Sequence, residues 1–319
     1  MRNTERGKTG IITFCLRFYP KNDYFCSRNV DLIYMDKKMK IRDWILELPK
    51  RGRLSFSTDD IQRQYPSLNK GAVVSSLKRL VKNGKIQSVW HGFYVIVPVE
   101  YGLRGIVPPV VYIDQLMTYL QKDYYIALLN AASFYGAAHQ QPQEFTVITG
   151  GKNLRDKLKN GIKINFVSKK MIPHAFIRKN TTKTGYVSVS SPELTALDLL
   201  LYQKEIGGLS RAGTVLNELV EEIDFDKFTP DFLKLFPVTA IQRFGYLLDE
   251  VMEQNDKAKI LLEKVKQAGI KFRKTPLKSE IQPDTLSEYE QNEIWKIVIN
   301  KNIHSSPQKS PPKFRCTTP

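Results

Sequence analysis

The stretch at residues 54–98 constrains the fold more than any other part of the chain. It reads LSFSTDDIQRQYPSLNKGAVVSSLKRLVKNGKIQSVWHGFYVIVP. Two segments with helical periodicity are separated by Pro66, and two short alternating segments, 85–88 and 93–97, follow around a Trp-His-Gly turn. The order helix, turn, helix and hairpin predicts a winged helix-turn-helix at residues 36–98, a unit that ordinarily reads duplex DNA.

Local chemistry supports each boundary of these two helices. Ser57 or Thr58 can cap the first helix, because their hydroxyls accept hydrogen bonds from free backbone N–H groups at a helix start. Asn69 can cap the second helix in the same way, and Asn83-Gly84 is a typical helix end. We therefore expect one short and one longer helix.

The second helix predicts a surface for nucleic acid. At about 100° per residue, five aliphatic residues share one face, namely Val73, Val74, Leu77, Leu80 and Val81. The opposite arc combines small side chains with cations, namely Ala72, Ser75, Ser76, Arg79 and Lys82, with Lys70 in the first turn and Lys78 on the flank. Arg79 lies almost opposite Leu77 and is the first candidate for a base-edge contact.

Two alternatives remain open for this unit. An amphipathic helix with a solvated charged face has the same pattern, and winged helices also serve as protein-docking modules. The local charge favours DNA, because residues 36–98 hold thirteen Lys and Arg against five Asp and Glu.

Composition narrows the class of protein further. The 319 residues are 42% hydrophobic and 25% charged, as in globular proteins, but the formal net charge is +17, which fits a polyanionic partner. No apolar run reaches the roughly 18–20 residues of a membrane-spanning helix, and the N-terminus makes a poor signal peptide. The three cysteines lack metal-ligand spacing and favour a reducing cytoplasm. We expect no membrane association.

The chain divides into five predicted parts, which are an irregular N-terminal extension (1–35), the winged unit (36–98), a linker (99–113), a second domain (114–275) and a tail (276–319) that is largely disordered apart from one late strand at 295–299. Predicted helices lie at 41–48, 114–120, 123–138, 192–204, 209–222, 238–253 and 256–268, and predicted strands lie at 145–149, 163–167, 175–178 and 186–189. A strand-rich middle followed by helices predicts an α+β fold.

A second basic surface is predicted in this domain. Residues 151–185 hold ten Lys and Arg and a single acid, whereas residues 186–253 hold twelve acids and five bases. The basic segment could touch nucleic acid through Lys152, Arg155, Lys157, Lys159 and Lys163. Solvated loops and helix faces are the alternative explanation of both segments.

Motifs for catalysis are sparse. Gly150-Gly151-Lys152 lacks the flanking residues of a phosphate-binding loop, and the four histidines have no ligand spacing. Glu193 fits the first turn of a helix, and Asp198, among leucines, is expected to cap a backbone group or pair with a base. His139 is expected to be structural. We predict no catalytic residue, no metal and no cofactor.

Two stretches of the second domain resemble a known family. Residues 112–143, YIDQLMTYLQKDYYIALLNAASFYGAAHQQPQ, and residues 190–208, SSPELTALDLLLYQKEIGG, are similar to the antitoxins (AbiEi) of AbiE-type, type IV toxin–antitoxin systems. The helix-turn-helix at 40–97 matches as well, so that the resemblance covers roughly residues 36–275.

The resemblance implies a cytoplasmic antitoxin and autorepressor in abortive infection, a form of phage defence. Such a protein binds inverted repeats ahead of its own operon and counteracts a nucleotidyltransferase-like toxin, with which direct contact is not required. Helix geometry then places Ser75, Ser76, Arg79 and Lys82 toward the operator, and Gln87 and His91 on or near the wing. The alternatives are a docking module without DNA binding and an enzyme acting on the toxin or a nucleotide.

Overall fold

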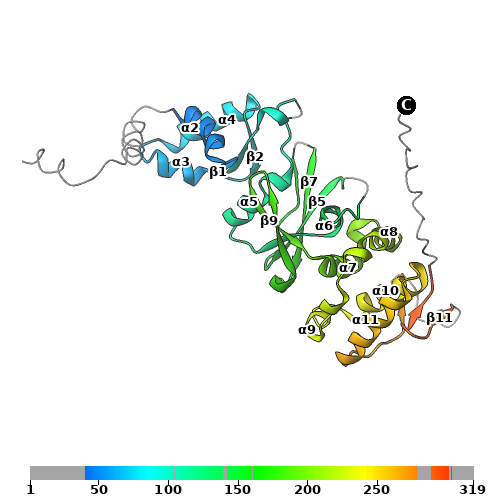
Figure 1. Ribbon diagram of the computed structural model, residues 1–319. Coiled ribbons are helices and arrows are strands. Elements are labelled where there is room, and N and C mark those ends of the chain that lie inside the picture. The colour runs from blue at the N-terminus through cyan, green and yellow to red at the C-terminus, as the bar shows by residue number, and fades with distance from the viewer. Residues whose placement is uncertain are drawn as a thin grey trace, which may run out of the picture.

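The computed structural model describes residues 40–103, 105–138, 142–159, 161–278, 289–301 and 303. The predicted extension at 1–35, His139 and residues 304–319 lie outside these ranges. Three groups of elements follow one another along the chain: a small helical unit with a hairpin, a central sheet, and a group of helices (Figure 1). The predicted mixture of helices and sheets is confirmed.

Within the described residues 40–98, the N-terminal unit contains three α-helices and a three-stranded antiparallel sheet in the order β1-β3-β2. Its elements are α2 (Ile41–Glu47), β1 (Ser55–Ser57), α3 (Thr58–Gln64), α4 (Lys70–Lys82), β2 (Ile86–Trp90) and β3 (Phe93–Ile96), with a 3₁₀ turn η1 (Leu48–Arg51) after α2. The Ser57 hydroxyl caps α3 in a capping box with Asp60, and the Asn69 side chain caps α4. β1 was not predicted, because three residues are too short to show a strand period.

The buried face of α4 is narrower than its sequence predicts. Val73, Leu77 and Leu80 are buried, but Val74 and Val81 are 46% and 39% exposed. The three buried residues centre the inward face between Leu77 and Leu80, which leaves the two valines on its edge. Val74 and Val81 share the apolar face of the helix, as predicted, but they lie at its exposed edge and outside the core.

The β2–β3 hairpin joins the N-terminal unit to the rest of the molecule. Because side chains alternate along a strand, its two faces point into two different cores. Ile86 and Ile96 pack with the helices of the N-terminal unit, whereas Val89, Phe93 and Val95 pack in a cluster that includes the central sheet. The hairpin thus contributes to both cores and connects the two units.

The second half of the segment predicted as a linker, residues 105–113, is packed against this second cluster, whereas Val99 and Leu103 in its first half are exposed. Val107 is fully buried, and Val111 and Tyr112 are buried as well. Two short 3₁₀ helices, η2 (Val99–Tyr101) and η3 (Pro109–Val111), shape the segment. Its prolines mark these turns and do not mark an exposed connection, which corrects the prediction.

A mixed six-stranded sheet in the order β6-β7-β5-β4-β9-β8 forms the centre of the molecule. Its strands are β4 (Tyr124–Ile126), β5 (Glu144–Gly150), β6 (Lys157–Lys159), β7 (Ile162–Lys169), β8 (Ile177–Thr182) and β9 (Gly185–Ser190). The accompanying helices are α5 (Ile113–Tyr119), α6 (Leu128–Phe134) and η4 (His174–Phe176). β5 runs parallel to β7 and β4 runs parallel to β9, while the other neighbouring pairs are antiparallel.

The predicted helix at 123–138 is in part a strand. β4 lies in the middle of the sheet between β5 and β9, and α6 begins only at Leu128, whose φ of 55° breaks the chain direction. A short apolar run that is buried on both sides looks the same in sequence whether it is a strand or a helix.

Helices complete the second half of the chain. They are α7 (Pro192–Leu201), η5 (Gln203–Ile206), α8 (Leu209–Leu219), η6 (Val220–Glu222), η7 (Phe225–Lys227), α9 (Pro230–Leu233), α10 (Val238–Tyr246), η8 (Leu247–Val251) and α11 (Asn255–Gln267). Nearly every residue of α7 is buried, which makes it the central helix of the largest hydrophobic core.

The end of the chain returns to this core. β10 (Thr275–Pro276), β11 (Gln291–Asn292) and β12 (Ile297–Val298) form a small sheet. Trp295 is 1% exposed and lies in the core beside α10. The strand predicted at 295–299 is thus confirmed in position, and the described residues around it, 289–301, pack with it. Most of the other residues of the predicted tail lie outside the described ranges.

Candidate nucleic-acid interface

The outward face of α4 presents the predicted polar and cationic side chains. Ser75, Lys78, Arg79 and Lys82 are exposed, as is Lys70 in the first turn, whereas Ser76 is half-buried on the flank. Gly71, which has no side chain, and Ala72, which has only a methyl group, are exposed as well. A helix with this surface can approach another molecule closely while its cations reach around it.

A basic groove lies along one flank of α4. It has a volume of about 540 Å³ and runs between α4 and the start of α2. Four cations line it, namely Lys40, Arg42, Arg79 and Lys85, together with the polar side chains of Ser76 and Asn83. Among the residues that the structure describes, none of these cations pairs with a carboxylate.

Three of these cations, Lys40, Arg42 and Lys85, were not among the predicted DNA-binding residues. They come from a different helix and from the turn after α4, so the periodicity of α4 could not reveal them. The only signal was the local excess of positive charge over residues 36–98. Together with Arg79 they create a positive field in a concave surface, which suits an anionic backbone.

Gln87 does not lie on the surface of the hairpin. It is 4% exposed, and its side-chain oxygen accepts a hydrogen bond from the backbone N–H of Val107 at 3.3 Å. His91 is exposed at the turn, but its carbonyl oxygen accepts a hydrogen bond from the Tyr119 hydroxyl at 3.2 Å. Gln87 therefore lies on the hairpin, as predicted, but the prediction that it binds DNA is corrected, because that face of β2 packs on the central unit.

Part of the second basic surface adjoins the hairpin. The Lys157 ammonium lies over the Trp90 ring, 4.4 Å from its centroid, and the edge of Trp90 meets Phe166. A cation held against an indole face is stabilised by the ring quadrupole. β6 is therefore fixed beside β2, which brings a predicted cation of the second domain to the N-terminal unit.

The other cations of the predicted second surface differ in how freely they can contact a phosphate. Lys152 and Arg155 are exposed, and Lys159 belongs to β6 by its backbone. Lys163 forms an ion pair with Glu144 at 3.0 Å. Hydrogen bonds from Asn165 and Lys163 lower the pKa of Glu144, so that it remains ionised and offsets the charge of Lys163.

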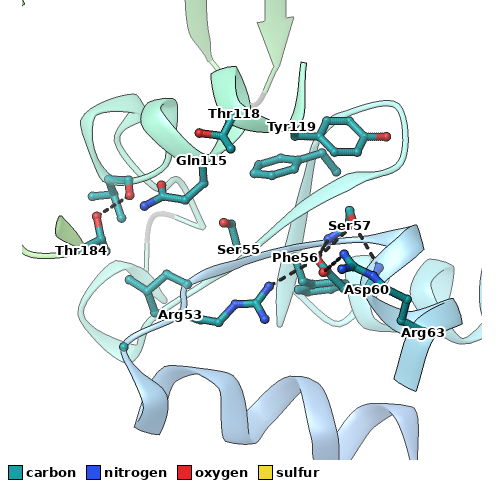
Figure 2. A pocket seen from close by; sticks show the side chains of 14 residues that line it. Arg53, Ser55, Phe56, Ser57, Asp60, Arg63, Gln115, Thr118, Tyr119 and Thr184 are labelled. Atoms are coloured by element: carbon teal, nitrogen blue, oxygen red, sulfur yellow. Dashed lines mark hydrogen bonds and ion pairs between the residues drawn. The ribbon is translucent and has the colours of Figure 1, made fainter. Parts of the chain in front are cut away.

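A cavity of about 390 Å³ with both apolar and polar lining lies between β1, α3 and α5. Figure 2 shows Arg53 and Arg63 on either side of Asp60, with Gln115 and Thr118 of α5 opposite them. Asp60 accepts from Arg63 at 2.7 Å and from Arg53 at 3.3 Å while it also caps α3. These charged side chains pair with one another at the capped start of α3.

The two carboxylates considered for catalysis are buried in the second domain. Asp198 accepts hydrogen bonds from Lys169 at 2.8 Å and from the Tyr125 hydroxyl at 2.7 Å, which confirms the expectation of a basic partner. Burial raises the pKa of Asp198, although Lys169 opposes that shift. Burial also raises the pKa of Tyr125.

Glu193 lies in the first turn of α7, as predicted, and is fully buried. One of its oxygens accepts a hydrogen bond from the backbone N–H of Asp224 at 3.1 Å. The carboxylate therefore ties the start of α7 to the loop before η7. Within the described residues, no group of three or more His, Cys, Asp or Glu side chains could hold a metal ion, and no helix could span a membrane.

Taken together, these features define a protein with a cationic helix-and-hairpin unit fixed to a mixed sheet that is backed by helices. Residues 125–250 match a family model described as the AbiEi antitoxin C-terminal domain. The predicted resemblance to AbiE-type antitoxins is therefore confirmed over this part of the chain. This match covers most of the central sheet together with α7 to α10.

A solved structure with low sequence identity shows a similar fold. The crystal structure of the RV2827C protein from Mycobacterium tuberculosis has a TM-score of 0.57 and 15% identity, over 80% of this chain and 89% of that chain. An antigenic nucleotidyltransferase-like protein from Paracoccidioides brasiliensis has a TM-score of 0.32 and 12% identity, over 48% of this chain and 89% of that chain, a likeness too low to carry an argument. The chain matches none of the curated proteins.

Proposed function

We propose that the N-terminal unit is a winged helix-turn-helix that binds operator DNA, with α4 as its recognition helix. The observation that carries this proposal is the basic groove of Lys40, Arg42, Arg79 and Lys85 beside the exposed face of α4, in which these cations have no carboxylate partner among the described residues. Cations gathered from α2, α4 and the start of the hairpin can follow a phosphate backbone while α4 occupies the major groove.

The antitoxin domain supports a second part of the proposal. The protein represses its own operon by binding inverted repeats, and it counteracts a nucleotidyltransferase-like toxin in the cytoplasm as part of phage defence. Neutralisation of the toxin need not involve a stable complex. An antitoxin domain joined to a DNA-reading unit through a packed hairpin is the arrangement that such a repressor needs.

β6 adds a second contact with the same DNA. Lys157 is held beside β2, and Arg155 and Lys152 are exposed on the segment that leads to it. These side chains can neutralise phosphates beyond the reach of α4. Since the hairpin is buried on both faces, this strand takes over part of the role that a projecting wing has elsewhere.

Fluorescence anisotropy with duplex DNA from upstream of the gene tests the proposal, with a scrambled duplex of equal composition as the reference. We expect preference for the upstream duplex and a steep loss of affinity between about 50 and 200 mM salt. Arg79→Ala and Lys157→Ala should weaken binding, each reducing the salt slope by about 1. Lys266→Ala, an exposed cation on α11, is the matched control.

Equal and weak binding to both duplexes would contradict the repressor role. A protein-docking module without DNA binding, the competing function, predicts that outcome together with no effect of Arg79→Ala. The groove gives this second function no specific support, because a protein partner would have to bury four cations that have no carboxylate partner among the described residues.

A further inference from the structure

We propose that Val74 of α4 makes an apolar contact with the methyl group of a thymine in the operator, and that Arg79 contacts the phosphate backbone. The inference rests on the proposed DNA binding and assigns the base contact within it. It reverses the roles that helix periodicity suggested, because the sequence placed Val74 on the apolar face and Arg79 at the bases.

Val74 is the largest apolar side chain on the exposed stripe at the start of α4. It is 46% exposed, and its neighbours on the helix surface, Lys70, Gly71, Ser75 and Lys78, are exposed as well. Residues near the N-terminus of a recognition helix reach the base edges when the helix enters the major groove. Val74 lies in the second turn, where such contacts are made.

The surroundings of Val74 identify DNA as the partner that covers it. A single exposed valine is common on a protein surface. This one is distinguished by its place, because it lies between two lysines and beside a glycine and a serine on the outward face of α4. A protein partner would have to desolvate both ammonium groups, whereas a major groove offers phosphates on each side. The apolar group presented there is the thymine methyl.

Arg79 belongs to a different surface. It lines the basic groove together with Lys40 of the α2 N-cap and Lys85 of the following turn. These three cations come from separate elements, and a groove of this kind follows a backbone of regularly spaced charges. The guanidinium therefore positions the duplex and carries little sequence information.

Replacement of thymine by deoxyuridine tests the contact, because uracil differs from thymine only by the missing methyl group. The upstream duplex is prepared with single substitutions at each thymine and measured against wild-type protein, Val74→Ala and Val81→Ala. For the wild type we expect a loss of about fourfold at one position of a half-site, the effect of one buried methyl group. Val74→Ala should bind the two duplexes equally.

Val81→Ala is the matched control, since Val81 is similarly exposed at 39% but lies about 10 Å farther along the helix. It should keep the discrimination between thymine and uracil. Arg79→Ala should keep it too, while binding every duplex more weakly.

Specific binding by the wild type without sensitivity to any uracil substitution would overturn the Val74 contact and leave the proposed DNA binding intact. Equal sensitivity in Val74→Ala and the wild type would overturn it as well. An absence of specific binding by the wild type would overturn the proposed function itself, and the contact with it.

Discussion

Trp295 lies directly against the backbone of Gly245, so closely that a Cβ atom at position 245 would overlap the indole ring. The contact joins the end of the described chain to α10. Three hydrogen bonds hold the tryptophan in place, from its indole N–H to Asp249, from its backbone N–H to Asn292 and from Gln242 to its carbonyl oxygen.

Gly245→Ala should therefore destabilise the protein. The added methyl group meets a rigid, fully buried ring that cannot shift without breaking its hydrogen bonds. We expect a loss of about 3 kcal/mol in the free energy of unfolding, the upper range for an overpacked core. Urea denaturation followed by tryptophan fluorescence measures it.

Gly213→Ala in α8 is the control for this substitution. Gly213 is also buried in a helix, but an added Cβ would make only ordinary contacts, the nearest at 3.5 Å. Alanine there should be neutral or stabilise by up to about 1 kcal/mol. Equal losses from both substitutions would show that the chain end does not fix α10.

Gln87 provides a second prediction, because its buried side chain should contribute to folding stability and not to DNA binding. Gln87→Ala leaves the buried N–H of Val107 without its acceptor and should lower the free energy of unfolding by about 1–3 kcal/mol. The affinity for DNA at a temperature well below unfolding should stay unchanged.

Lys85→Ala should show the opposite pattern, with unchanged stability and weaker DNA binding, since Lys85 is exposed in the basic groove. The pair is measured by thermal unfolding and by anisotropy. A loss of DNA affinity in Gln87→Ala without a loss of stability would restore Gln87 to the interface.

The contrast between Gln87 and Lys85 shows how much of this structure can be predicted from local sequence patterns. Ser57, Asn69 and Gly84 carry local signals, and the helices that they delimit were predicted to within a few residues. Burial of Gln87 depends on Val107, twenty residues away, and no local pattern contains that contact. The same limit applies to β4, because Tyr124–Ile126 becomes a strand only through its neighbours β5 and β9.

A polar and cationic surface on α4 was predictable, but the full set of residues that form the candidate interface was not. Helix periodicity placed Ser75, Arg79 and Lys82 on the outside of α4 correctly. It could not supply Lys40 or Arg42, which reach the groove from α2. A surface built from several elements requires the tertiary arrangement, whereas a surface on one helix requires only its period.

Glu144 gives a third prediction, which concerns the second basic surface. Glu144→Gln removes the carboxylate that pairs with Lys163 and should free this lysine for a phosphate. The salt slope of DNA binding should become steeper by about 0.9, the value of one contact. The same substitution in a Lys163→Ala background should have no effect, and any effect there would contradict the pairing.

The pH dependence of this effect follows from the lowered pKa of Glu144. A carboxyl whose pKa is lower in the folded state stabilises that state above its unfolded pKa, about 4.3, and loses this contribution as the pH falls through the folded value. Glu144 therefore stays ionised between pH 5 and 8. The difference between wild type and Glu144→Gln in DNA binding should be constant over that range.

The buried pair of Lys169 and Asp198 gives the last prediction. Lys169 lies between the carboxylate, at 2.8 Å, and the ring of Phe236, 4.6 Å from its centroid. Lys169→Met keeps the apolar stem but leaves a buried carboxylate without its cation. We expect a loss of about 3–5 kcal/mol in the free energy of unfolding at neutral pH.

The loss should depend on pH in a defined direction. Without Lys169, only the hydrogen bond from Tyr125 opposes the effect of burial, and the folded pKa of Asp198 rises further above the unfolded value. A raised carboxyl pKa means that stability is present at low pH and is lost as the pH rises through the folded value. Lys169→Met should therefore be closer to wild type at pH 5 than at pH 8 in urea denaturation. Lys169→Met combined with Asp198→Asn, which removes the charge and keeps an acceptor for Tyr125, should recover much of the loss and abolish its pH dependence. A Lys169→Met variant equally destabilised at both pH values would show that the pair contributes through packing and not through charge.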